Sequence, residues 1–396
     1  MTELILEQAK TMLPELQKLR RKLHTIPEFG LQLPKTLEAI LGEVSPLGEI
    51  TLGKTITSAV LHIKGGKPGP TVLLRADMDA LSVVEETGLE YASTNGFMHA
   101  CGHDLHMAIG VGAAKLLHAR KDELAGDVIM LFQPGEEGHH GADVMIEEGA
   151  LMVSGSKPIR AYGLHVFSSY PLGMMGSRAG ALMASAGDLL VTVSGSGGHG
   201  SMPWLSKDPI SVLTEIIPSL QTMITKRFNA FDPVIINVGW LRAGDTATTN
   251  VIPESASFGA TVRVFSEENA KLLKQYTEEL VQAMATGFGL SATVEFTRAT
   301  KVLINDTDAI ASVEKVATGL FGQSRYVNLP TPMAGAEDFA SILREVPGAF
   351  VFMGACPPNV DFRTAATNHS NKAVFDDSIL ADGAALLASL AIEALS

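Results

Sequence analysis

The feature that most constrains the fold is an alternation of apolar strand-like runs with helical patterns. The apolar run at 71–80 is followed by a helical pattern at 104–118, and the run at 127–133 by another at 142–151. A further apolar run follows at 159–167. Such alternation is typical of an α/β protein whose mainly parallel sheet is covered by helices on both faces. Ligands of these sheets bind beyond the carboxyl ends of the strands.

A different pattern interrupts this alternation between about residues 186 and 298. Its elements follow the order strand, helix, strand, strand, helix, strand, which makes a complete ferredoxin-like unit. The α/β pattern then resumes and ends in a helix. A chain of 396 residues is also longer than chains that usually fold around a single hydrophobic core. We therefore predict a discontinuous catalytic domain, 1–185 and 299–396, interrupted by an inserted lid or dimerisation domain, 186–298.

The amino-acid composition limits the kinds of molecule that the protein can bind. A net charge of −13 argues against a nucleic acid or an anionic membrane as partner. Two cysteines give no disulfide framework, and the N-terminal MTELILEQAK lacks the basic region of a secretory signal. No apolar window is long enough for a membrane span. These features predict a cytoplasmic protein with a small-molecule substrate.

Four metal-ligating side chains crowd into the segment MHACGHDLH: His99, Cys101, His103 and His106. Thiolate and imidazole suit zinc and similar metals. We interpret Cys101 and His103 as the start of a metal site. The alternative is a buried thiol beside imidazoles that satisfy backbone groups at a helix start.

The other groups of a metal site should lie at strand ends far along the chain. Glu136 and Glu137 follow a strand and a Pro-Gly turn, His165 closes an apolar strand, and His369 lies in a polar loop. Adjacent glutamates suit a division of labour, one binding metal and the other accepting a proton from water. Each group alone could be an exposed acidic turn, a core histidine or a loop histidine. The case rests on all of them lying on one predicted rim.

Five ligands are too many for one tetrahedral zinc that keeps a position open for water. Two metal ions that share a bridging ligand would use all five. The five candidates are Cys101, His103, Glu137, His165 and His369.

Between about residues 20 and 380, an ordered set of motifs resembles the M20 metallopeptidases. The likeness is to the amidohydrolase branch, which includes hippurate hydrolases, N-acyl-amino-acid aminoacylases and auxin-conjugate hydrolases. It implies a dinuclear-metal catalytic domain interrupted by a lid or dimerisation domain. The motifs are RRKLHTIPE, RADMDAL, MHACGHDLHMA, QPGEEGHHGA, GLHVF, GGHGSMP, GAEDF and NHS.

The resemblance assigns roles to the catalytic-domain residues. It implies that the five candidates above bind two divalent ions, which we expect to be Mn, Co, Ni or Zn, and that Glu136 is the general base. Relatives with a His-x-Asp ligand motif have their His where this chain has Asp77. We expect Asp79, two residues later, to orient ligands instead.

Three residues of the inserted domain also match the family. The resemblance implies that His199, supplied by the partner subunit of a homodimer, stabilises the developing oxyanion. Asn250 and Arg263 resemble positions that hold the substrate carboxylate, for which an Arg fork is well suited. For Arg263 the alternative is a strand residue paired with an acid.

The resulting prediction is metal-dependent hydrolysis of the amide bond of N-acyl-L-amino acids, which gives a carboxylate and a free amino acid. A dipeptidase or carboxypeptidase would use the same groups on a different substrate. A metal-dependent binding or scaffold protein is the non-enzymatic alternative.

Overall fold

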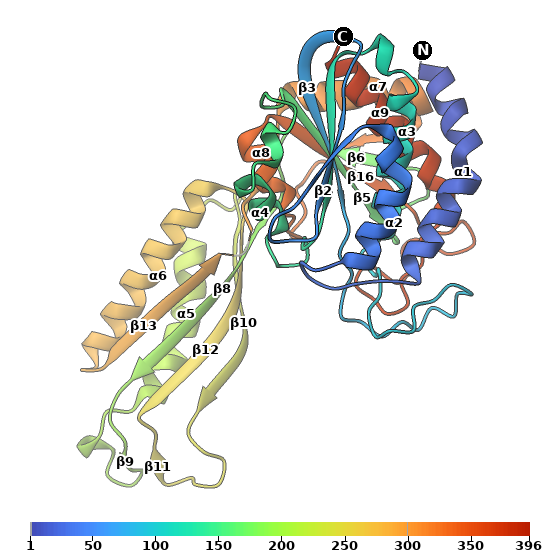
Figure 1. Ribbon diagram of the computed structural model, residues 1–396. Helices are drawn as coiled ribbons and strands as arrows, with labels where there is room; N and C mark the ends of the chain where they lie inside the picture. The colour runs from blue at the N-terminus through green and yellow to red at the C-terminus, as the bar shows by residue number, and fades with distance from the viewer. Residues whose placement is uncertain (1, 299) are drawn as a thin grey trace. The chain divides into compact units, whose positions relative to one another are not determined.

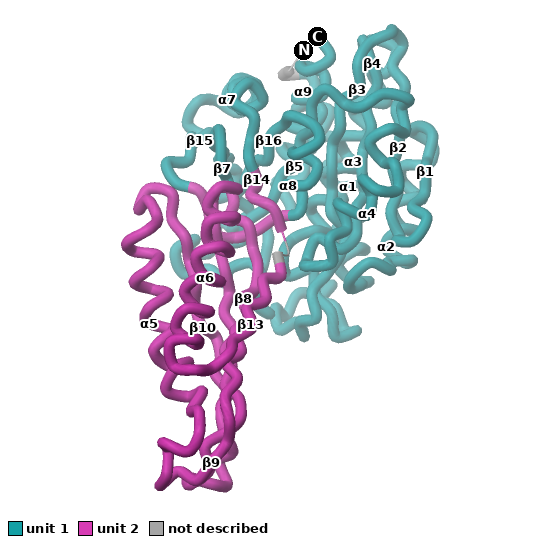
Figure 2. The backbone as a smooth tube through the Cα atoms, turned by 90° about the vertical axis from the view of Figure 1, so that its left-hand side faces the viewer, with its two compact units in different colours: residues 1–182, 304–331, 338–396 teal, residues 183–303, 332–337 magenta. Residues whose placement is uncertain are grey.

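The computed structural model describes residues 2–298 and 300–396, and these form two compact units (Figure 2). Unit 1 contains the described residues of Met1–Leu182, Ile304–Thr331 and Asp338–Ser396. Unit 2 contains those of Met183–Leu303 and Pro332–Glu337. Within the described part of the chain, none of the helices combines the length and apolar character that crossing a bilayer requires.

Unit 1 is built on an eight-stranded mixed sheet. Its four central strands, β4, β3, β5 and β16, are parallel, whereas the pairs β1–β2, β2–β4 and β16–β6 are antiparallel. The predicted α/β class is confirmed, with the antiparallel pairs outside the central four strands. The strands in sheet order are β1 (Glu49–Leu52), β2 (Ala59–Ile63), β4 (Ala125–Gln133), β3 (Lys67–Asp77), β5 (Arg160–Phe167), β16 (Gly348–Gly354), β6 (Met175–Ser177) and β15 (Tyr326–Asn328).

Helices cover this sheet on both sides, and α1, α3 and α9 pack against one another on one of them (Figure 1). Small residues allow the close packing of α3, because a Cβ on Gly112 would lie 2.8 Å from the Cβ of Ala384 in α9. The helices of unit 1 are α1 (Thr2–His24), α2 (Pro34–Val44), α3 (His103–His118), α4 (Gly141–Glu147), α7 (Thr307–Phe321), α8 (Phe339–Glu345) and α9 (Leu380–Ala394).

Unit 2 has the predicted βαββαβ order. An antiparallel sheet, in the order β10-β12-β8-β13, packs against α5 and α6. The side chain of Ser266 caps α6 by accepting a hydrogen bond from the amide of Asn269. The elements are β8 (Ser185–Ser194), α5 (Pro209–Arg227), β10 (Val234–Ala243), β12 (Ser255–Val264), α6 (Glu267–Gly287) and β13 (Ser291–Arg298).

Two small ribbons complete the described strands. At one end of unit 2, β9 (Gly198–His199) pairs with β11 (Val251–Ile252), as Figure 1 shows. The second ribbon joins β7 (Gly180–Met183) and β14 (Leu303–Asn305).

Three segments are assigned differently from the predicted bounds of 186–298. Residues 183–185, the described residues 300–303 and Pro332–Glu337 all belong to unit 2. Pro332–Glu337 belongs to unit 2 because it is hydrogen-bonded to that unit: the amide of Ala184 donates to the carbonyls of Met333 and Gly335, at 3.1 and 2.9 Å. The assignment of the two units as separate folding domains stays a prediction.

Candidate metal centre

The candidate site lies in unit 1, at the carboxyl ends of neighbouring strands. Asp79 follows β3, Glu136 and Glu137 follow β4, and His165 is near the end of β5. His369 lies in the loop between β16 and α9. The parallel order of the central strands therefore brings these groups to one rim of the sheet.

The five predicted ligands form two groups that share one sulfur atom. In each group the ligand atoms lie within 4.8 Å of one another. The Sγ atom of Cys101 lies 3.3 Å from Nε2 of His165 and 3.2 Å from Nε2 of His369. The first group is Cys101, His103 and His165, and the second is Cys101, Glu137 and His369.

Two of the histidines are held in the orientation that metal ligands need. The Nδ1 atom of His103 lies 2.8 Å from the carbonyl oxygen of Asp79, and that of His165 lies 2.8 Å from the carbonyl of Val166. Each Nδ1–H donates to a carbonyl, so each Nε2 keeps a free lone pair. The Nε2 of His103 is buried and has no hydrogen-bond partner among the described residues. A cation would satisfy it, so the donor set fits bound metal.

The pKa shifts of the ligands differ in direction. Burial would lower the pKa of His103, but the Asp77 carboxylate outweighs it and raises the pKa well above its ordinary value. Burial, helped by the neighbouring His106 and His103, holds the pKa of His165 well below its ordinary value. This imidazole is therefore neutral, as a ligand must be. Burial and the Glu137 carboxylate raise the pKa of the Cys101 thiol. A nearby metal ion offsets this cost because it stabilises the thiolate directly.

Asp79 connects the ligands with the predicted general base. Its two carboxylate oxygens accept the backbone N–H groups of Glu136 and Glu137, each at 2.9 Å. Its carbonyl oxygen accepts from His103. Glu136 is only 8% exposed, and its carboxylate lies within 4.8 Å of ligand atoms of His103 and Glu137. It is thus positioned to exchange protons with a water molecule at this site.

His106 is close to the ligands, but both of its ring nitrogens are occupied. Its Nδ1 lies 2.6 Å from a carboxylate oxygen of Asp77, and its Nε2 accepts the backbone N–H of Val166 at 2.9 Å. Asp77 also forms a buried ion pair with Arg75. The pair of Asp77 and His106 therefore fixes the end of β5 beside His165, and His106 is not available as a ligand.

Comparison with known proteins identifies the family. The family model described as peptidase family M20/M25/M40 matches residues 73–393. The chain belongs to this family. A dinuclear metal-binding M20 peptidase from Bacillus subtilis has a solved structure that superposes with a TM-score of 0.84 at 30% identity, over 98% of this chain and 99% of that one. The chain thus has the fold of a dinuclear M20 enzyme.

Characterised relatives match over most of their length. The IAA-amino acid hydrolase ILR1-like 2 of Arabidopsis thaliana is 35% identical, covering 96% of this chain and 84% of the relative. Thermostable carboxypeptidase 1 of Saccharolobus solfataricus is 35% identical, over 95% and 94%. The N-acetyldiaminopimelate deacetylase of Bacillus cytotoxicus is 34% identical, over 85% and 88%.

Asn368 lies at this site, although the sequence alone did not predict a role for it. The Nδ2 atom of Asn368 donates to the carbonyls of Cys101, at 3.1 Å, and Val166, at 2.9 Å, and its Oδ1 accepts the amide of Ser168. It thereby joins three loops. The adjacent His369 has a φ of +70°, a conformation that is uncommon for a residue other than glycine. The motif NHS contained this signal, but only its histidine has the chemistry of a ligand.

The predicted residues of unit 2 lie at its two ends. The amide of Gly200 donates to the carbonyl of Asn250 at 2.7 Å, so Asn250 is beside His199. Within β12, eight steps along the chain separate Ser255 from Arg263, which is about 27 Å in an extended strand. Arg263 therefore lies far from the other two within one chain. Its guanidinium donates to the side chain of Thr261 at 2.7 Å and to a backbone carbonyl.

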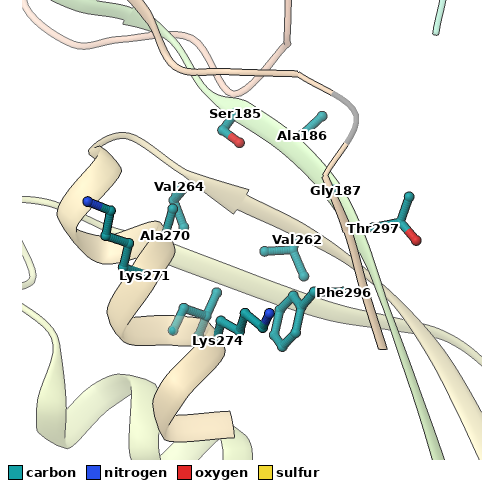
Figure 3. A pocket seen from close by; sticks show the side chains of 11 residues that line it. Ser185, Ala186, Gly187, Val262, Val264, Ala270, Lys271, Lys274, Phe296 and Thr297 are labelled. Atoms are coloured by element: carbon teal, nitrogen blue, oxygen red, sulfur yellow. The ribbon is translucent and has the colours of Figure 1, made fainter. Parts of the chain in front are cut away.

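Unit 2 also contains a cavity of about 280 Å³ beside α6 (Figure 3). The side chains of Lys271, Lys274 and Phe296 line it, together with small and aliphatic residues. None of its lining residues is His, Cys, Asp or Glu, so it offers no metal donors. We assign it no part in the metal centre.

Proposed function

We propose that the protein is a metal-dependent amidohydrolase that cleaves N-acyl-L-amino acids into a carboxylate and a free amino acid. The observation that carries this proposal is the pair of ligand groups sharing Cys101, with the buried carboxylate of Glu136 beside them. Two relatives support the substrate class, since their names describe hydrolysis of IAA-amino acid conjugates and deacetylation of N-acetyldiaminopimelate.

The ligand groups Cys101, His103, His165 and Cys101, Glu137, His369 would hold two divalent ions, Mn, Co, Ni or Zn, which would supply Lewis acidity and lower the pKa of water. Glu136 accepts a proton from the water that attacks the amide carbonyl, and then delivers a proton to the leaving amine. Asp79 holds the backbone of Glu136 in place. His199 from the partner subunit donates a hydrogen bond to the oxyanion.

The substrate carboxylate is held by Asn250 and Arg263 in this proposal. Because the two lie at opposite ends of unit 2, one substrate takes them from different subunits. The protein is then a homodimer, and its free buried cysteines suit the reducing cytoplasm. A solution mass measurement that finds an active monomer would contradict the role of His199 from the partner.

The substitution Glu136→Gln tests the mechanism. It keeps the size of the side chain but removes its capacity to accept a proton, so we expect the turnover rate to fall by about 10²–10⁴-fold. Bound metal and the unfolding temperature should stay at the wild-type level. Glu123→Gln, on an exposed turn, is the matched control. Wild-type turnover by Glu136→Gln would exclude this general base.

A carboxypeptidase or dipeptidase is the second candidate, favoured by the likeness to thermostable carboxypeptidase 1. Hydrolysis rates for hippurate, N-acetyl-amino acids and dipeptides, measured with each of the four metals, separate the two activities. A metal-dependent binding or scaffold protein would hydrolyse none of these after metal reconstitution.

A further inference from the structure

The imidazole of His199 is engaged on one side by Ser201. Its Nδ1 atom accepts the backbone N–H of Ser201 at 3.2 Å and lies 2.8 Å from the Ser201 hydroxyl. A backbone N–H can only donate, so Nδ1 must present its lone pair. The proton of the neutral ring is then on Nε2.

The turn around His199 is ordered by its own backbone. His199 pairs with Val251 between β9 and β11, and the amide of Met202 donates to the His199 carbonyl at 2.8 Å. The amide of Gly200 is held by Asn250. Because Ser201 is only two residues from His199 in an ordered turn, little additional chain entropy is lost when their side chains meet.

We infer that Ser201 is a positioning residue that holds His199 in the tautomer with its proton on Nε2. This inference rests on the proposed function, in which His199 stabilises an oxyanion. A developing oxyanion needs a hydrogen-bond donor that is already in place. In the other tautomer, Nε2 would present a lone pair and repel the oxyanion. Ser201 therefore makes a neutral histidine into a donor.

The tautomer can be measured without substrate by ¹⁵N NMR of metal-loaded protein labelled at histidine, at an alkaline pH where imidazoles are neutral. The signals of His199 are assigned by their loss in His199→Asn. We expect one pyrrole-type Nε2 and one pyridine-type Nδ1 in the wild type and in Ser201→Thr. In Ser201→Asp the new carboxylate accepts from Nδ1–H and competes with the backbone N–H, whose contact is longer, at 3.2 Å, so the two nitrogen types should exchange. A wild type protonated on Nδ1, or a Ser201→Asp spectrum unchanged from the wild type, would overturn the inference.

Kinetics provide the second measurement. Loss of one oxyanion donor lowers kcat by about 10²–10³-fold, and we expect Ser201→Asp to approach that loss with KM nearly unchanged. Ser201→Thr should retain wild-type kcat. Ser206→Asp is the matched control, since it adds the same charge to the same loop, where the Ser206 hydroxyl donates to the Pro203 carbonyl at 3.0 Å. An equal fall in kcat for both Asp variants would overturn the role of Ser201.

The two proposals fail in different ways. If the wild type hydrolyses no N-acyl-amino acid, the proposed function fails while the measured tautomer stands. If an active enzyme has the other tautomer, the inference about Ser201 fails alone.

Discussion

The Nε2 atom of His369 lies 3.2 Å from the Sγ atom of Cys101, across 268 residues of sequence. The same sulfur lies 3.3 Å from His165, which belongs to the other ligand group. One side chain is thus common to both groups, while every other ligand belongs to only one of them. Removal of the sulfur should therefore affect two metal ions, and removal of His369 only one.

We expect Cys101→Ser to weaken the binding of both metals, because a hydroxyl is a poorer ligand than a thiolate. His369→Ala should leave one ion tightly bound. The metal content per subunit after dialysis, measured by elemental analysis, distinguishes these outcomes. Cys356→Ser is the control, since this buried thiol is not among the candidate ligands. Two tightly held ions in Cys101→Ser would show that the sulfur is not shared.

Asp79→Asn tests the orientation of ligands by hydrogen bonds. Both carboxylate oxygens of Asp79 accept backbone N–H groups, and an amide replaces one of these acceptors with a donor. Substitutions of this kind typically cost about 10–100-fold in metal affinity or activity, and we expect that range here. Titration with metal of the apo protein gives the affinity, with the exposed Asp122→Asn as control. Unchanged affinity and activity would refute this role.

Gly102→Ala should destabilise the turn between Cys101 and His103. Gly102 has a φ of +87°, and a Cβ there would lie 2.5 Å from Cγ2 of Val166. Gly96 has nearly the same φ, +88°, with no atom within 4 Å of its Cβ position. Gly96→Ala should therefore cost only the backbone strain, about 1–2 kcal/mol. The difference between the stability losses of the two variants, measured by thermal unfolding, gives the contribution of the steric clash with Val166. Equal losses would show that Val166 moves aside without destabilising the fold.

The buried pair of His24 and Asp104 predicts a pH dependence of stability. Burial alone would lower the pKa of His24, but the Asp104 carboxylate, 2.8 Å from Nδ1, outweighs it and raises the pKa to about 8, from 6.5. The charged pair therefore stabilises the fold fully below pH 6.5, by about 2 kcal/mol. This contribution is lost as the pH rises through 8.

The free energy of unfolding of the metal-free wild type should fall as the pH rises across this range, and that of His24→Gln should lack this fall. Parallel curves of unfolding free energy against pH for the two proteins would contradict the role of His24. Chelation is needed because ligand protonation would otherwise alter the pH dependence.

The strand ends could be predicted, and the candidate ligands proposed, because each signal is local. An apolar run followed by an acid or histidine marks a site at the rim wherever strands are parallel. The role of Asn368 could not be predicted, because its side chain bonds to three backbone carbonyl and amide groups that only the folded chain brings together. The same is true of His106, which looks like a ligand in sequence and is excluded by the groups on both of its nitrogens.

The distance between Asn250 and Arg263 could not be predicted from the sequence motifs either. Both residues resemble positions that hold the substrate carboxylate in the family, and they remain proposed substrate ligands, but a motif carries no distance. The length of β12 separates them, and only the register of the sheet reveals this. The return of Pro332–Glu337 to unit 2 is a similar case, because it depends on pairing with residues about 150 positions earlier.

The position of β16 in the sheet has a consequence for synthesis. β5 pairs with β16, which the ribosome makes later, after the insertion: Ala161 pairs with Gly348, which is 187 residues further along the chain (348 − 161). At translation speeds of about 5–20 residues per second, one edge of β5 waits roughly 10–40 s for its neighbour. The insertion has all six of its elements in one continuous stretch and can fold during that pause. The insertion can therefore finish folding before the sheet of unit 1 is complete, and the ligand group that contains His369 is assembled last.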